Sequence, residues 1–379
     1  MAAKTSTPVE TLDPERKKFW NNETEAIIGI MFVLLILGTI NVFSSSFVKA
    51  DSMYGSPYYY LWRHGINIGV GLVAFIICFR FDYHIWRRYM PFILGLTLLA
   101  LTLVLFVGPE VNGARRWLPL YVTQFQPAEV AKLVAIMIAA AYLARQIRHG
   151  LEINIFTVQM GLIAAMFLLT ELEPDMGTAC IILGIPLIML IVAGLDRQKV
   201  YMILGGALAG AVLMILRNTY RLERLKVMLD PWSDAQNYGY QTVQSLSAIG
   251  SGELTGMGLG VGMSKYDYLP EAHTDFAFAI FCQENGFLGA IFVFMLFAAL
   301  AVYATRIAAK ARDEFGQMLA MGIMILIVGQ AIGNLLMVGG MFPVVGIPLP
   351  FISYGGTSLI VTMASMGILA SIGRLGKND

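Results

Sequence analysis

The sequence predicts an all-α polytopic membrane protein of about ten transmembrane helices. The chain of 379 residues is 57% hydrophobic and only 13% charged, and its mean hydropathy is +0.69. A soluble domain carries about 25% charged residues, so this composition excludes an ordinary soluble protein. The charges occur in short groups between uncharged runs as long as a membrane-crossing helix, which needs about 20 apolar residues. The net charge of +1 gives no indication of a nucleic-acid-binding surface.

The first 25 residues are polar and contain four basic side chains, followed by an uncharged run at 27–48. A signal-peptide core spans about 7 to 15 residues, and this run is longer. We therefore expect a cytoplasmic tail at residues 1–25 and a retained first span. The remaining chain is expected to form a single membrane domain at 26–373, followed by a short cytoplasmic tail at 374–379.

Ten segments have the composition of a membrane span. They are 27–48, 61–79, 91–107, 128–144, 155–171, 176–194, 200–216, 276–305, 317–340 and 355–372. The last two are separated because residues 315–373 contain no charge over 59 positions, which is too long for one span. Prolines and glycines break this run, and we expect the connection between the two spans to dip back into the protein.

Lysine and arginine in the short connections predict the orientation. With the N-terminus inside, the cytoplasmic segments carry sixteen basic residues and the short external segments carry four. Both termini are therefore expected in the cytoplasm. This orientation makes 217–275 the one large extracytoplasmic loop, between the seventh and eighth spans.

The large loop begins with a basic, amphipathic stretch. Arg217, Arg221 and Arg224 fall on one helical face and leucines fall on an adjacent one, which is typical of a helix lying in the membrane interface. These arginines either contact lipid headgroups or recruit an anionic, lipid-linked substrate. Both interpretations remain open from the residues alone.

The same loop ends in the polar stretch YDYLPEAHTD at 266–275, which leads directly into the apolar run FAFAIF. A carboxylate is costly at the bilayer, so Glu271 and Asp275 indicate a functional site. His273 lies between them as a hydrogen-bonding candidate, whereas Asp267 has no role that we can argue. An aspartate directly before a helix is also a preferred N-cap, and this is the structural alternative for Asp275.

A second charged pair lies near the outer end of the fourth span. Glu129 and Lys132 are spaced i, i+3 and therefore share one helical face. They either neutralise each other as a structural ion pair or present charge to a ligand.

Two external turns carry further candidates. Arg116 and Trp117 precede the fourth span; arginine matches a pyrophosphate bidentately, although an aromatic belt with snorkelling arginine explains the same residues. Asp175 starts the sixth span and is expected to cap it. The three cysteines occupy apolar runs without paired spacing and predict neither a disulfide nor a metal site.

Five motifs together resemble one known family. They are NGARRWLPL, FQPAEVAKL, EPDMGTA, GIPLPFISYGGTSL and the long run from QSLSAIGSGELTG to LPEAHTDFAFAI. They resemble the SEDS proteins, the RodA, FtsW and SpoVE group of bacterial elongation, division and sporulation, over about residues 27–372. The motifs resemble FtsW and SpoVE more closely than RodA.

This resemblance implies a ten-span fold in the bacterial cytoplasmic membrane with an outward-facing active site. It implies an inverting glycosyltransferase that polymerises lipid II, the undecaprenyl-pyrophosphate-linked disaccharide pentapeptide, into peptidoglycan strands. The implied partner is a class B penicillin-binding protein, a transpeptidase. A lipid II flippase and a non-catalytic scaffold for the transpeptidase are the alternatives; ionisable groups gathered at the external ends favour an enzyme.

The resemblance also assigns roles to the candidates. Asp275 corresponds to the essential aspartate and is expected to act as general base. Seven residues are expected to bind substrate or organise the site: Arg116, Trp117, Glu129, Lys132, Asp175, Glu271 and His273. No cofactor is certain; if a divalent cation, Mg²⁺ or Mn²⁺, assists, Asp275 and Glu129 are its candidate ligands. Gln283 and Asn285 depart from the family's usual Glu-Glu-Leu-Gly.

Overall fold

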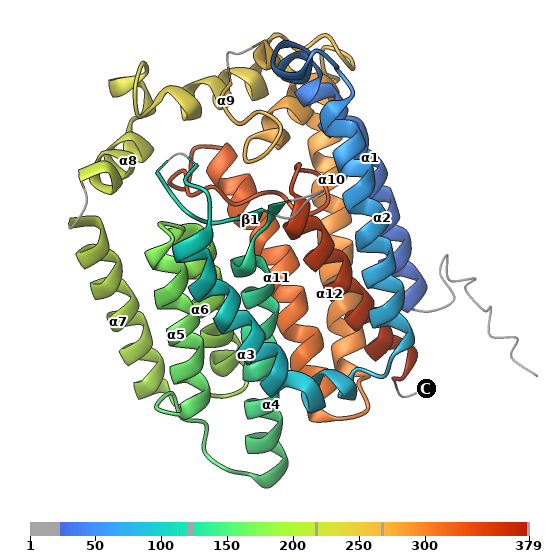
Figure 1. Ribbon diagram of the computed structural model, residues 1–379, viewed down its shortest axis with the longest axis vertical. Helices are drawn as coiled ribbons and strands as arrows, with labels where there is room; N and C mark the ends of the chain where they lie inside the picture. The colour runs from blue at the N-terminus through green and yellow to red at the C-terminus, as the bar shows by residue number, and fades with distance from the viewer. Residues whose placement is uncertain (1–22, 112, 120–123, 217–218, 267–268, 377–379) are drawn as a thin grey trace, which may run out of the picture.

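The computed structural model describes residues 23–111, 113–119, 124–216, 219–266 and 269–376. Over these residues the protein is mainly helical, with one two-stranded antiparallel hairpin. Most of the long helices stand side by side in one bundle (Figure 1). The prediction of an all-α fold is confirmed.

A described helix overlaps each of the ten predicted spans. The helices are α1 (Glu23–Tyr54), α2 (Tyr59–Arg80), α3 (His84–Val107), α4 (Pro127–His149), α5 (Val158–Leu172), α6 (Met176–Val192), α7 (Arg197–Leu216), α10 (Ala277–Ala309), α11 (Glu314–Val338) and α12 (Gly356–Arg374). Among the described residues, seven helices are long and apolar enough to cross a membrane, while α5 and α6 are shorter apolar helices. The chain is therefore a multi-pass membrane protein.

The remaining elements lie in two connections. The hairpin of β1 (Leu118–Pro119) and β2 (Gln124–Phe125) lies between α3 and α4. The α7–α10 connection, residues 217–276, contains four further elements: α8 (Thr219–Leu229), the 3₁₀ helix η1 (Pro231–Asp234), α9 (Tyr240–Ser251) and the 3₁₀ helix η2 (Met263–Lys265). A helix does form where the amphipathic basic pattern predicted one. Arg217 and Asp267 lie outside the described residues.

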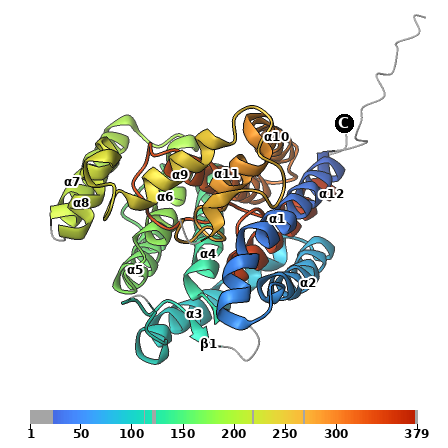
Figure 2. The same cartoon turned by 90° about the horizontal axis from the view of Figure 1, so that it is seen from above.

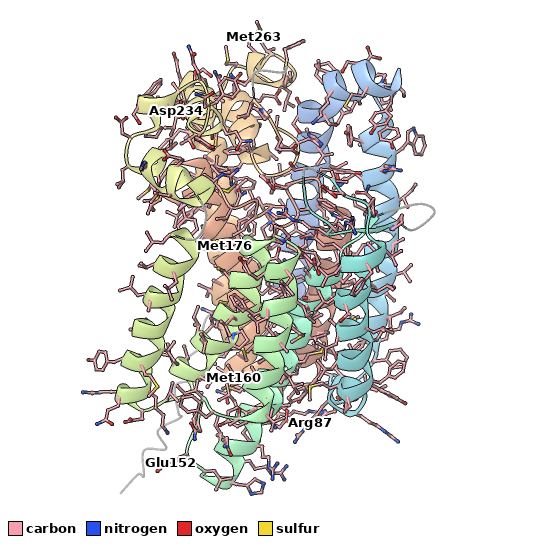
Figure 3. All side chains as sticks on the ribbon, turned by 60° about the vertical axis from the view of Figure 1, so that its left-hand side comes forward. Arg87, Glu152, Met160, Met176, Asp234 and Met263 are labelled. Carbon is pink, nitrogen blue, oxygen red and sulfur yellow. The ribbon has the colours of Figure 1, made fainter. Side chains whose placement is uncertain are left out.

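The start of α1 and the end of α12 lie at the same end of the bundle. Lys310, which follows α10, approaches Glu23 at 3.5 Å, and a Cβ on Gly373 would lie 2.4 Å from the Thr24 hydroxyl. Arg87 and Glu152 lie at one end of the molecule and Asp234 and Met263 at the other (Figure 3). The second end, which carries α8 and α9 in Figure 1, is called the α8–α9 end below.

Helix α4 occupies the interior of the bundle (Figure 2). In its most apolar window 94% of the residues are buried, against 17% in α3 and 28% in α2. Its many alanines allow neighbouring helices to approach closely. Pro127 starts the helix, and Gly150 ends it with the positive φ of 61° that a glycine accepts readily. Charged residues on α4 are consequently placed inside the protein.

The connection between α11 and α12 folds back into the bundle, as predicted. Leu349, Phe351 and Ile352 are buried there. A glycine on α1 permits this path, since a Cβ on Gly38 would lie 1.9 Å from the Phe351 carbonyl oxygen. Residues 339–355 are thereby held against α1 and close to the end of α11.

We predict that Gly38→Ala destabilises the protein by about 1 to 3 kcal/mol, because the added methyl group overpacks against backbone that cannot move aside. Thermal unfolding of the purified protein in detergent measures this change. Gly205→Ala on α7 is the matched control, since a Cβ there meets nothing within 4 Å. Equal unfolding temperatures for Gly38→Ala and the wild type would contradict the tight contact.

Candidate functional site

Asp275 lies at the end of the α7–α10 connection and is held there by α11. The Asn334 side-chain amide donates to the Asp275 carbonyl oxygen at 2.8 Å and to the Ile347 carbonyl oxygen at 2.7 Å. Helix α10 begins at Ala277, and its N-cap residue Phe276 makes no side-chain cap hydrogen bond. The interpretation of Asp275 as an N-cap is therefore wrong, because the carboxylate precedes the capping position.

The Asp275 side chain is half-buried: protein atoms crowd the carboxylate, yet part of the residue stays accessible. Burial of the carboxylate raises the pKa of Asp275, the negative charges of Glu271 and Asp175 also raise it, and Arg116 and Arg224 lower it; the net result is a pKa of about 7. A carboxyl with a pKa near neutrality accepts a proton far more readily than an ordinary aspartate does. Asp275 is thus suited to act as a general base.

The two arginines that influence Asp275 come from separate connections. Arg116 donates from Nε to the Glu173 carbonyl oxygen at 3.3 Å and from a terminal nitrogen to the Pro174 carbonyl oxygen. Arg224, on α8, donates to the Val344 carbonyl oxygen in the α11–α12 connection. The tertiary structure therefore brings two positive charges near one carboxylate. Trp117, beside Arg116, is half-buried.

The turn between α5 and α6 carries two buried carboxyl groups. Asp175 accepts from the Thr178 backbone N–H at 3.2 Å, which confirms that it caps α6, and from the Gln126 side-chain amide at 2.9 Å. Burial raises its pKa. Burial and the Asp175 charge also raise the pKa of Glu173 to about 9, so Glu173 is protonated at neutral pH.

Glu129 and Lys132 form an ion pair of 2.8 Å inside the protein, with side chains only 4% and 3% exposed. Lys132 also donates to the Gln330 side-chain oxygen at 3.1 Å. Gln330 in turn donates to the Pro348 carbonyl oxygen at 2.9 Å. The pair is therefore connected to α11 and to the α11–α12 connection, as well as being neutralised internally.

One face of α11 contacts both the Glu129–Lys132 ion pair and Asp275. Gln330 contacts Lys132, and Asn334, one helical turn later, contacts Asp275. The Asp175 carboxylate is close enough to both groups to interact electrostatically with Glu129 and with Asp275. The predicted residues on α4, α6 and the α7–α10 connection thus belong to one site at the α8–α9 end.

Glu271 and His273 lie beside this site with different surroundings. Glu271 accepts from the Thr274 hydroxyl at 2.8 Å and has a positive φ of 53°. His273 is 5% exposed, and its ring lies 4.7 Å from the Tyr60 ring. Burial and the charge of Lys49 lower the pKa of His273 to about 4, so its imidazole is neutral at physiological pH.

Arg224 and Glu173 were missed as site residues by sequence reasoning. The arginine spacing on α8 was visible, and recruitment of an anionic ligand was one of its two interpretations. Its proximity to Asp275 depends on how the α7–α10 connection folds back. Glu173 stood beside Asp175 in the sequence, but nothing local indicated complete burial.

The residues present do not form a favourable divalent-cation site. The described part of the chain contains no group of three His, Cys, Asp or Glu side chains that could hold a metal ion. Of the two expected ligands, Glu129 is already engaged by Lys132 at 2.8 Å. A cation at the same Glu129 oxygen would have to displace that ammonium group.

Comparisons with known proteins identify relatives along nearly the whole chain. The family model for cell cycle proteins of the FtsW, RodA and SpoVE type matches residues 24–378. Stage V sporulation protein E of Bacillus subtilis is 36% identical over 355 residues, covering 93% of this chain and 97% of that protein. A probable peptidoglycan glycosyltransferase FtsW of Nitrosococcus halophilus is 39% identical over 353 residues, covering 91% of each.

Solved structures show the same fold. A chain from a peptidoglycan synthase complex, described as coordinating polymerisation and crosslinking, matches with a TM-score of 0.75 and 27% identity, covering 95% of this chain and all of that one. The rod shape determining protein RodA of Thermus thermophilus matches with a TM-score of 0.69 and 25% identity, covering 93% of this chain and 97% of that one. With a family model matched over residues 24–378, this chain belongs to the FtsW, RodA and SpoVE family of cell cycle proteins.

Proposed function

We propose that this protein is a peptidoglycan glycosyltransferase that polymerises lipid II into glycan strands at the outer face of the bacterial cytoplasmic membrane. The observation that carries the proposal is Asp275, a carboxylate with a pKa raised to about 7 within the influence of Arg116 and Arg224. A base and nearby positive charge are what transfer of a sugar from a pyrophosphate requires. Relatives bearing the name peptidoglycan glycosyltransferase support it.

The proposed topology has ten spans with both termini in the cytoplasm. It is supported by the excess of lysine and arginine in the connections on that side and by the shared end of α1 and α12. The α8–α9 end then faces outward. Asp275 would meet the lipid-linked substrate in the outer leaflet.

In the proposed reaction the 4-hydroxyl oxygen of the acceptor sugar attacks the anomeric carbon of the donor. The new carbon–oxygen bond forms as the bond to the pyrophosphate oxygen breaks, and the configuration at that carbon inverts. Asp275 takes the hydroxyl proton. The bonding electrons leave with undecaprenyl pyrophosphate, whose added negative charge needs nearby cations.

Arg116 and Arg224 are the cations that we assign to the pyrophosphate, with Trp117 supporting the first of them. Glu129 and Lys132 organise the site from α4, through Gln330. Asp175 holds the start of α6 beside them. Glu271 raises the proton affinity of Asp275, and neutral His273 is a hydrogen-bonding group at the edge of the substrate site.

The proposed partner is a class B penicillin-binding protein that crosslinks the strands. Support comes from the solved peptidoglycan synthase complex, which contains a chain of this fold and is described as coordinating polymerisation and crosslinking. The relatives named FtsW and the sporulation protein favour a role in division or spore formation. The function is tested by measuring lipid II polymerisation before and after Asp275 is replaced.

Asp275→Asn should lower the rate of lipid II polymerisation by about 10² to 10⁴-fold, the usual contribution of a general base. Labelled lipid II supplied to the purified protein and its cognate transpeptidase gives the rate, read as glycan strands on a gel. Asp51→Asn, at an exposed position near the end of α1, is the control and should polymerise normally. If Asp275→Asn polymerised lipid II at the wild-type rate, the assignment of Asp275 as the general base would be wrong.

The polymerisation rate should rise with pH and level off above a midpoint of about 7, because burial raises the pKa of Asp275 to that value and only the deprotonated carboxylate accepts a proton. Single-turnover rates across a pH series measure the midpoint. Unfolding temperatures recorded at each pH separate this effect from loss of fold. A midpoint of about 4, the ordinary aspartate value, would contradict the environment described for Asp275.

Lys132→Met should destabilise the protein by about 3 to 5 kcal/mol, because it leaves the Glu129 carboxylate buried without its cation. The double variant Glu129→Leu/Lys132→Met removes both charges and should recover most of that stability. If the pair organises the site, the double variant remains inactive in polymerisation even though its stability is restored. Wild-type polymerisation by a stable double variant would show that the pair only neutralises itself.

A further inference from the structure

A second buried ion pair lies outside the residues assigned to the reaction. Lys265, in η2, and Glu284, in α10, approach to 2.7 Å, and their side chains are 0% and 1% exposed. Lys265 lies in the same short helix as Met263, at the α8–α9 end (Figure 3). Two charges removed so completely from water carry a large desolvation cost, which only close partners can offset.

The partners of this pair come from α1 and from the α7–α10 connection. The Ser44 hydroxyl, on α1, contacts the two Glu284 carboxylate oxygens at 2.6 and 2.7 Å. The Gly260 backbone N–H donates to the same carboxylate at 3.1 Å. The Lys265 ammonium also lies 5.0 Å from the centre of the Phe47 ring. The pair therefore joins α1, the α7–α10 connection and α10.

Helix α10 is interrupted just after Glu284. Gly286 has φ 65° and ψ −169°, which are not helical angles, so residues 277–285 form a segment separate from the long remainder of the helix. The α7–α10 connection pairs with the backbone around this break. Gly258 N–H donates to the Glu284 carbonyl oxygen at 3.1 Å, and Phe287 N–H donates to the Glu253 carbonyl oxygen at 2.9 Å.

The opposite end of the same segment adjoins Asp275. Asn334 holds the Asp275 carbonyl oxygen at 2.8 Å, and Asn41 donates to the Ala277 carbonyl oxygen at 3.0 Å. One short helical segment thus connects the proposed base at one end with the Lys265–Glu284 pair at the other. A shift of the far end would be transmitted to Asp275, because nine residues of helix form a nearly rigid connection.

We propose that Lys265 and Glu284 are positioning residues, whose buried ion pair fixes the α7–α10 connection on segment 277–285 and thereby places Asp275 for the reaction. The proposal rests on the proposed glycosyltransferase function. A buried ion pair is weak support for stability, since apolar residues of similar volume often serve equally well. Its directional contacts do select one arrangement of the three parts that it joins.

The experiment compares the full-length wild type with Lys265→Met and with Lys265→Met/Glu284→Leu, in which no unpaired charge remains. Lys226→Met is the matched control, since it removes an exposed ion pair to Glu223 of the same 2.7 Å length in the same connection. Polymerisation is measured over a range of lipid II concentrations. The double variant should lose about 100-fold in kcat, the order of effect of a misplaced catalytic group, with KM much less affected.

A second readout does not depend on activity. Cys282 is buried in segment 277–285 and is 4% exposed, so its rate of labelling by N-ethylmaleimide reports whether the connection covers it. In a Cys78→Ala/Cys180→Ala background, loss of the ion pair should raise that rate about tenfold or more, as local opening becomes easier. The Lys226→Met control should label at the parent rate.

The outcomes separate this proposal from the proposed function. Wild-type kcat and unchanged Cys282 labelling in the double variant would overturn the positioning role while leaving the glycosyltransferase assignment intact. Lost activity with unchanged labelling would also overturn it, because the residues would then act without moving the connection. If the wild type itself makes no polymer, the proposed function fails, and unchanged labelling in Lys265→Met would separately overturn the positioning role.

Discussion

Polar groups inside an apolar bundle have to be satisfied by other parts of the protein, and this requirement organises the α8–α9 end. An amide or charge that is buried in protein without a partner carries a high free-energy cost. Lys132 is paired with Glu129 and Gln330, and Asn334 is shared by two carbonyl oxygens. The contacts of Lys132 with Gln330 and of Asn334 with the Asp275 carbonyl join residues far apart in the sequence, so the site and the fold depend on the same bonds.

The carboxyl groups of the site have different pKa values because their surroundings differ. Burial raises the pKa of Glu173 to about 9 and that of Asp275 to about 7, so the first is neutral at physiological pH and the second is close to its midpoint. Arg116 opposes both changes. A site with graded proton affinities can hold one carboxyl as a hydrogen-bonding group and use another for proton transfer.

Close backbone approach, rather than side-chain bulk, holds the irregular segments in place. Gly38 admits the Phe351 carbonyl, and Gly286 interrupts α10 where the α7–α10 connection docks. This non-helical backbone is tolerated because N–H and carbonyl groups in it pair with other protein segments. Rigid helices thus support a site built largely from connections.

The sequence by itself determined the fold class, the positions of the long helices and most of the candidates for the site. Hydrophobic run length is a local property, and the charged stretch before α10 conflicts with its apolar neighbours whatever the tertiary arrangement. Only the tertiary structure decided that Arg224 lies near Asp275, that α11 joins Lys132 to Asp275, and that Lys265 pairs with Glu284. Those contacts depend on the path of a long connection, and on burial, which no local pattern of residues specifies.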